Sequence, residues 1–80
     1  MSIDLQRVRT ETIGVSRRVH LNNAGAALMP TPVLDAMTGY LRREAEIGGY
    51  EAADEQAECL QGVYGSVARL LNAAPDEIAL

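Results

Sequence analysis

The sequence predicts an N-terminal fragment of a larger α/β protein, mainly α-helical, with short strands near residues 19–22 and 77–80. Two long stretches repeat apolar residues with the period of an amphipathic helix. Residues 19–22 alternate apolar and polar side chains, and residues 78–80 are apolar, so both short runs are compatible with strands. Because an unpaired strand leaves backbone groups unsatisfied, we expect the chain to be truncated as its second strand begins.

The size and composition also indicate that further polypeptide is needed. Eighty residues form at most one small domain, whose stability alone is marginal. One cysteine and one histidine provide neither a disulfide framework nor a cluster of metal ligands. With three Tyr and no Phe or Trp, the core is thin. We therefore expect the apolar faces to pack on protein outside this chain.

The charge pattern excludes several functions. A net charge of −4 argues against a nucleic-acid partner and against an anionic membrane surface. All seven basic residues are arginine, so no side chain of this sequence can form an imine with a carbonyl compound.

The sequence also bears on localisation. The N-terminus lacks the basic and apolar regions of a signal peptide, and no apolar run reaches the ~18 residues of a membrane span. Together with the single cysteine, these features predict a cytoplasmic protein.

Residues 3–12 are expected to form a short helix, which Asp4 caps and Gly14 ends. The strand expected at 19–22 runs into Asn22–Ala27, a stretch of Asn, Gly and Ala. Asn and Gly tolerate left-handed backbone conformations, and small side chains let the backbone approach another group closely.

Two helices are expected after this loop. Thr31 as N-cap and Pro32 at the first helical position begin one that runs to about Ile47, before the stop Gly48–Gly49. A second spans about residues 52–72 and ends before Pro75. Its apolar stripe consists of Leu60, Val63, Tyr64, Val67, Leu70 and Leu71.

The segment His20–Pro30 resembles the N-terminal signature of class V aminotransferases, the fold-type I pyridoxal-phosphate (PLP) enzymes that include cysteine desulfurases. Leu21, Asn23 and Ala24 match the family's short strand and loop, whereas His20 and Asn22 depart from its commonest form. Residues 32–37 match its first helix, 67–71 its long helix, and 75–78 its Pro-Asp-Glu-Ile run. Residues 21–25, Leu-Asn-Asn-Ala-Gly, together with residues 47–51 look closer to the subgroup near isopenicillin-N epimerase and selenocysteine lyase.

The resemblance implies that residues 19–80 open the aminotransferase class V domain, truncated before its phosphate loop, and that residues 1–18 form an N-terminal arm. It implies a homodimer that uses PLP on an amino-acid substrate, for transamination, epimerisation or C–S or C–Se lysis. In that family the imine-forming lysine, the acidic partner of the ring and the phosphate loop all lie downstream. The fragment alone is thus expected to be inactive, without catalytic or cofactor-binding residues.

The resemblance further implies that Asn23, Ala24, Gly25 and Tyr50 line the active site, Tyr50 by reaching the partner subunit. Residues 23–25 are otherwise an ordinary strand-to-helix loop. Tyr50 is otherwise a half-buried side chain after a helix stop.

Three other chemical groups are interpreted as structural. His20 is expected to be a satisfied strand histidine rather than a general base. Cys59, near Glu55 and Glu58, is expected to be unreactive, because carboxylates raise the pKa of a thiol. The acids of residues 51–58 are expected to be a solvated face rather than a metal site.

The alternative to an enzyme is a small helical interaction or dimerisation module, built on the stripe of residues 60–71.

Overall fold

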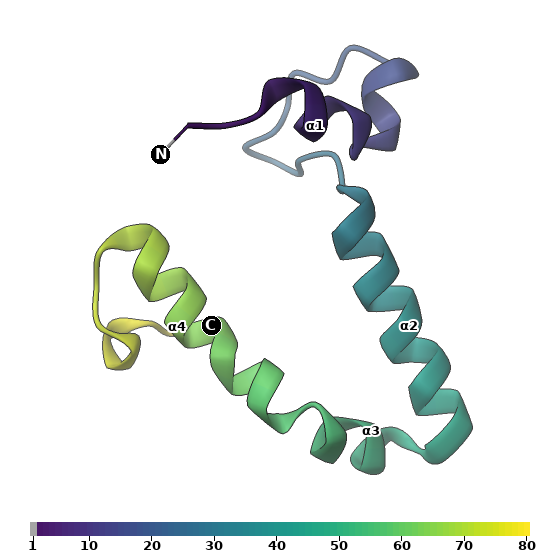
Figure 1. Ribbon diagram of the computed structural model, residues 1–80, viewed down its shortest axis with the longest axis vertical. Helices are drawn as coiled ribbons and strands as arrows, with labels where there is room; N and C mark the ends of the chain where they lie inside the picture. Colours follow the sequence, from purple (N-terminus) through teal and green to yellow (C-terminus); the bar gives the residue numbers. More distant parts are fainter. Residues whose placement is uncertain (1) are drawn as a thin grey trace. The chain divides into compact units, whose positions relative to one another are not determined.

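The computed structural model describes residues 2–80, which form helices and connecting segments with no β-strand among them (Figure 1). The chain divides into two compact units, up to Arg42 and from Arg43 onward. This division does not test the expected boundary at residues 18 and 19, which stays a prediction. The elements, in chain order, are α1 (Leu5–Thr10), the 3-10 turn η1 (Ile13–Ser16), α2 (Thr31–Ile47), α3 (Gly49–Glu55), α4 (Ala57–Leu71) and the 3-10 turn η2 (Pro75–Glu77).

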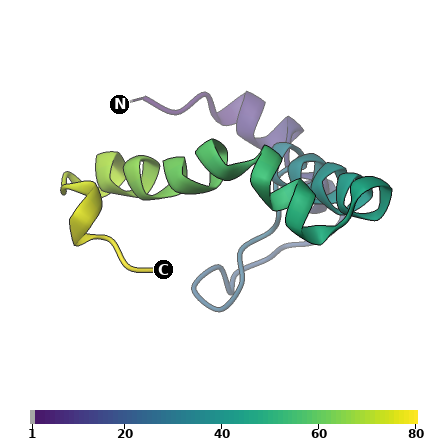
Figure 2. The same ribbon diagram turned by 90° about the horizontal axis from the view of Figure 1, so that it is seen from below.

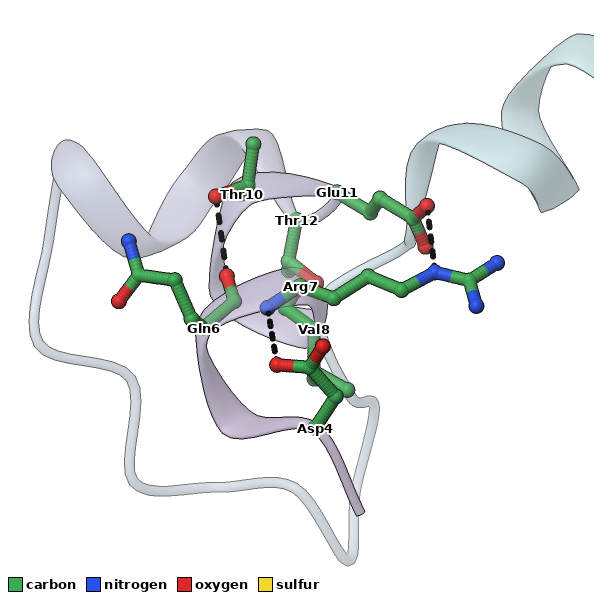
Figure 3. A network of polar contacts seen from close by, with 7 residues as sticks. All are labelled: Asp4, Gln6, Arg7, Val8, Thr10, Glu11 and Thr12. Atoms are coloured by element: carbon green, nitrogen blue, oxygen red, sulfur yellow. Dashed lines mark hydrogen bonds and ion pairs between the residues drawn. The ribbon is translucent and has the colours of Figure 1, made fainter.

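The N-terminal helix α1 is held by local polar contacts (Figure 3). Asp4 caps it, since its carboxylate accepts the backbone N–H of Arg7 at 3.0 Å. The Arg7 guanidinium donates to Glu11 one turn later at 3.1 Å. Both the expected helix and its Asp4 cap are confirmed, although α1 ends at Thr10, before Gly14.

The start of α2 is tied to the end of α1. The Thr31 N–H donates to the Glu11 carbonyl at 2.6 Å, across 20 residues of sequence. The Leu34 N–H donates to the Pro30 carbonyl at 3.1 Å, so the helical ladder begins at Pro30. The prediction that Thr31 is the N-cap is therefore wrong by one position. Figure 2 shows that the loop between η1 and α2 projects away from the helices of this unit.

Gly48 ends α2, as predicted. Its φ of 103° and ψ of 155° lie in a region that is open essentially to glycine alone. Gly49 does not extend this stop but opens α3. The expected second helix, residues 52–72, is thus wrong at its start.

The expected second helix is also divided in two. Gln56, with φ −101° and ψ 14°, separates α3 from α4. Its N–H still donates to Ala52, and its carbonyl still accepts from Leu60. Both backbone groups of Gln56 thus keep helical hydrogen-bond partners. The apolar residues therefore continue with nearly the same helical period across the break, and the sequence pattern did not reveal it.

Helix α4 ends at a left-handed residue, Asn72, with φ 55°. The Ala73 N–H donates to the Ala68 carbonyl at 2.9 Å, the six-residue closure of a Schellman ending. After η2, Ile78 is extended, with φ −101° and ψ 128°.

The strands expected near 19–22 and 77–80 do not form in the described chain. A strand is defined by hydrogen bonds to a neighbouring strand, and residues 2–80 contain no such neighbour. The extended backbone of Ile78 is therefore not part of a ladder.

The core of the described residues is very small: Ala52 and Ala68 are its buried apolar side chains. Large apolar side chains are exposed in both units, with Leu21 88% exposed and Leu70 74% exposed. The prediction of a thin core is confirmed, and most of the apolar surface has no covering protein in the described chain. None of the helices found in residues 2–80 has the length and apolar character to cross a membrane.

Candidate functional site

The Asn-Asn-Ala-Gly segment forms a tight turn that is closed by Asn22. The Asn22 side-chain oxygen accepts the Gly25 N–H at 3.3 Å, and its backbone carbonyl accepts the Ala26 N–H at 3.1 Å. Within residues 2–80, only Gly48 and Asn72 have left-handed φ values. The loop therefore does not use the left-handed backbone that its composition suggested, because hydrogen bonds from Asn22 close the turn instead.

Gly25 is needed for a close approach inside this turn. A Cβ atom at position 25 would lie 2.9 Å from the Asn22 amide nitrogen, closer than carbon and nitrogen pack. The small residue thus makes room for Asn22 of the same chain. Asn23, Ala24 and Gly25 are all exposed, and active-site lining by these residues stays a prediction.

His20 is satisfied by the same loop. One imidazole nitrogen, Nε2, lies 2.7 Å from the Ala26 carbonyl oxygen. Because a carbonyl only accepts, Nε2 carries the proton and donates it. The prediction of a satisfied histidine is confirmed, but it lies in a loop and not in a strand.

Tyr50 lies in the second unit, in the first turn of α3, and is 88% exposed. The alternative of a half-buried side chain is therefore wrong, because α3 begins at Gly49 and turns this residue to solvent. Its contact with a partner subunit stays a prediction. Cys59, on α4, is exposed and forms no disulfide.

Arg43 forms an ion-pair cluster that joins α2 to α3. Its Nη2 and Nε donate to the two Glu55 carboxylate oxygens at 2.6 and 2.9 Å, and Nη1 lies 3.4 Å from Glu46. These hydrogen bonds and the Arg43 charge lower the pKa of Glu55, and Glu55 in turn raises the pKa of Arg43.

This cluster modifies the interpretation of the acidic residues. Glu55 was expected on a solvated face, but it forms a bidentate ion pair with Arg43 across the break at Gly48. Helix spacing could not reveal a pair 12 residues apart. No three His, Cys, Asp or Glu side chains of the described chain lie together as a metal site would require.

The first unit contains a hollow that the sequence did not suggest. Its volume is about 410 Å³, and it is a shallow hollow that is largely open to solvent. We call it the arginine-lined hollow. It is lined by Arg9 of α1, Val15 of η1, and Arg18, Val19, His20 and Leu28 of the following loop.

Close packing fixes one wall of the arginine-lined hollow. A Cβ atom at Gly14 would lie 2.8 Å from a methyl carbon of Leu28, so only glycine lets Leu28 approach η1 this closely. Arg9 and Arg18 lie in different segments on either side of η1, so their approach leaves no periodic pattern in the sequence. Only the run Arg17–Arg18 in the sequence could have drawn attention to this region.

The residues present do not fit a covalently held PLP cofactor, because the sequence contains no lysine. Comparison of the chain with family models, with curated proteins and with solved structures gives no significant match.

Proposed function

We propose that this chain is the N-terminal segment of a cytoplasmic, homodimeric PLP-dependent enzyme that resembles class V aminotransferases and acts on an amino acid. The observation that carries the proposal is the order of the matching segments, from residues 20–30 through 32–37 and 67–71 to 75–78. Each match alone is weak, but their order and spacing agree over about sixty residues. The reaction subtype is transamination, epimerisation or C–S or C–Se lysis.

The very small core supports this proposal. A segment that packs on further polypeptide needs uncovered apolar faces, and Val33, Met37 and Leu41 of α2 are about half exposed or more. With only two alanines buried, the described residues gain little hydrophobic stabilisation by themselves. In the proposed enzyme these faces are covered by the rest of the domain.

The chemistry in this proposal comes from residues outside the chain. PLP supplies an electron sink for the substrate, and it needs a lysine that these 80 residues lack. The segment itself is expected to line the entrance to the active site through Asn23, Ala24, Gly25 and Tyr50.

The decisive experiment reads the gene beyond codon 80. We expect a small-residue turn that enters a helix just after Leu80, and much later a lysine that follows a strand. A stop codon directly after Leu80, in a gene without a frameshift, would contradict the proposal.

A second experiment tests the chain itself. The 80-residue chain with an acetylated N-terminus is incubated with PLP, reduced with borohydride and examined by mass spectrometry. We expect no adduct, since no side chain can form an imine. The matched control is the chain with a free N-terminus, which reacts weakly. A stoichiometric adduct on the acetylated chain would count against the assignment of the lysine to another segment.

The exposed stripe of α4 favours a second candidate, a helical dimerisation module. Leu60, Leu70 and Leu71 are 50%, 74% and 63% exposed. A module of this kind gives a cooperative thermal transition whose midpoint rises with protein concentration. The enzyme-segment proposal instead expects a broad transition of the isolated chain that does not depend on concentration. Circular dichroism at two concentrations distinguishes them.

A further inference from the structure

We propose that the arginine-lined hollow binds a small organic anion with an apolar body. This inference concerns a ligand site within the first unit and does not rest on the proposed enzymatic function. It depends on three observations: the composition of the walls, the partners of the two arginines, and the distribution of charge along the chain.

The walls of the hollow divide into apolar and cationic parts. Val15, Val19 and Leu28 supply apolar surface, and Arg9 and Arg18 supply two guanidinium groups. No acidic residue lines the hollow. A ligand that satisfies both parts needs an anionic head and an apolar body.

The two arginines are available for such a ligand. Elsewhere Arg7 pairs with Glu11 and Arg43 pairs with Glu46 and Glu55, whereas Arg9 and Arg18 form no ion pair with any residue that the structure describes. Guanidinium groups hold carboxylates and phosphates through two parallel N–H donors. The N–H donors of Arg9 on α1 and of Arg18 in the loop could therefore both bind the anionic head group of one ligand.

His20 adds a polar side chain to the wall, but its Nε2–H is not free to bind the anion. Its Nε2–H is already used by the Ala26 carbonyl at 2.7 Å. That bond fixes the ring beside the hollow, so the histidine shapes the wall and the arginines provide the charge.

The charge of the whole first unit favours an anion. Five of the seven arginines but three of the eleven acidic residues lie in residues 1–42, which gives this part a net charge of +2. Residues 43–80 have two arginines and eight acids, a net charge of −6. A basic unit within an acidic chain attracts anions to itself.

The test is a titration of the full chain by NMR, observed at backbone amides and at the arginine Nε–H groups. The probes are isocaproate, isoamyl phosphate and the neutral isocaproamide. We expect saturable shifts at Arg9, Arg18 and Leu28 with the two anions, at dissociation constants of roughly millimolar or below. The tighter of the two anions identifies a carboxylate or a phosphate ligand. Equal binding of the neutral amide, or no saturable shift with either anion, would overturn the proposal.

Matched variants separate local contacts from net charge. R9Q/R18Q removes both guanidinium groups of the hollow, and R17Q/R42Q removes the same charge from the same unit without touching its walls. We expect the first to weaken binding about tenfold or more, because each charged hydrogen bond contributes strongly. The second should change it about twofold at most, as a screened surface effect. Equal losses in the two variants would refute a site at the hollow.

A third variant perturbs the shape alone. G14A pushes Leu28 away from η1 while every charge stays in place. We expect a measurable loss of affinity for isocaproate with unchanged circular dichroism. Should R9Q/R18Q lose its helices, the wild-type titration and G14A still decide the question.

Discussion

The two units of the chain are stabilised in different ways. In the first, one backbone hydrogen bond, from Thr31 to Glu11, joins the end of α1 to the start of α2, and the other hydrogen bonds are local turns and caps. In the second, consecutive helices satisfy their backbones locally, and the Arg43–Glu55 pair bridges a one-residue break. The first unit is basic and the second acidic. The apolar period therefore indicates the helices of the second unit but not the break at Gln56, whereas the first unit depends on individual contacts.

The largest expected effect concerns the break at the start of the second unit. G48A places a side chain in a conformation that only glycine adopts freely, and it should destabilise the chain by about 1–3 kcal/mol. G49A is the matched control, because its Cβ would meet Glu44 at an ordinary 3.7 Å and gains helix propensity. Urea denaturation followed by circular dichroism measures both. Equal stability of G48A and G49A would show that the break does not require Gly48.

In the first unit the largest expected effect is at the N-cap. D4A removes the acceptor for the Arg7 N–H and should cost α1 about 1 kcal/mol. D4N keeps the cap and should retain most of the helix. Cα chemical shifts of residues 5–10 report the helix population. Should D4A and D4N give the same shifts, the cap contributes nothing to α1.

A smaller gain is expected within the exposed helices. Gly39 of α2 and Gly62 of α4 have no atom within 4 Å of an added Cβ. G39A and G62A should each stabilise the chain by about 0.5–1 kcal/mol, because alanine restricts the unfolded backbone and favours the helix. Thermal melting of each single variant measures the gain. A loss at G62A would mean that this face of α4 is covered.

The smallest expected effect is a pH dependence at the Arg43 cluster. Arg43 lowers the pKa of Glu55 below its ordinary 4.5, so the pair stabilises the folded chain above that pH. This contribution disappears as pH falls through the lowered folded-state pKa, where Glu55 is protonated. Helicity of the wild type should therefore decline more than that of E55Q between neutral and acidic pH. Parallel acid titrations of the two chains would contradict the pair's contribution.

The difference between the units also explains what could be predicted from the sequence. The Asp4 cap, the Gly48 stop and the helical stretches of α2 and α4 were predicted, since each has a local signal. The break at Gln56 was missed because it leaves the apolar period nearly intact. The strands were predicted wrongly, because strand composition does not provide a partner strand.

The candidate site was less accessible to sequence reasoning. Asn23, Ala24, Gly25 and Tyr50 came from a family resemblance, and their role stays a prediction. The arginine-lined hollow depends on Arg9, Arg18 and Leu28 being brought together by the turn at η1. Such a contact between distant segments has no fixed spacing, so the sequence offered only the run Arg17–Arg18 as a weak signal for it.

The backbone at Gly48 has a consequence for amide exchange. Its N–H donates to the Glu44 carbonyl at 2.8 Å, and its carbonyl accepts the Ala52 N–H at 3.0 Å. The chain thus passes from α2 to α3 with both the N–H and the carbonyl of Gly48 hydrogen-bonded. Deuterium should therefore exchange at the Gly48 and Ala52 amides as slowly as at the amides of the neighbouring helical turns.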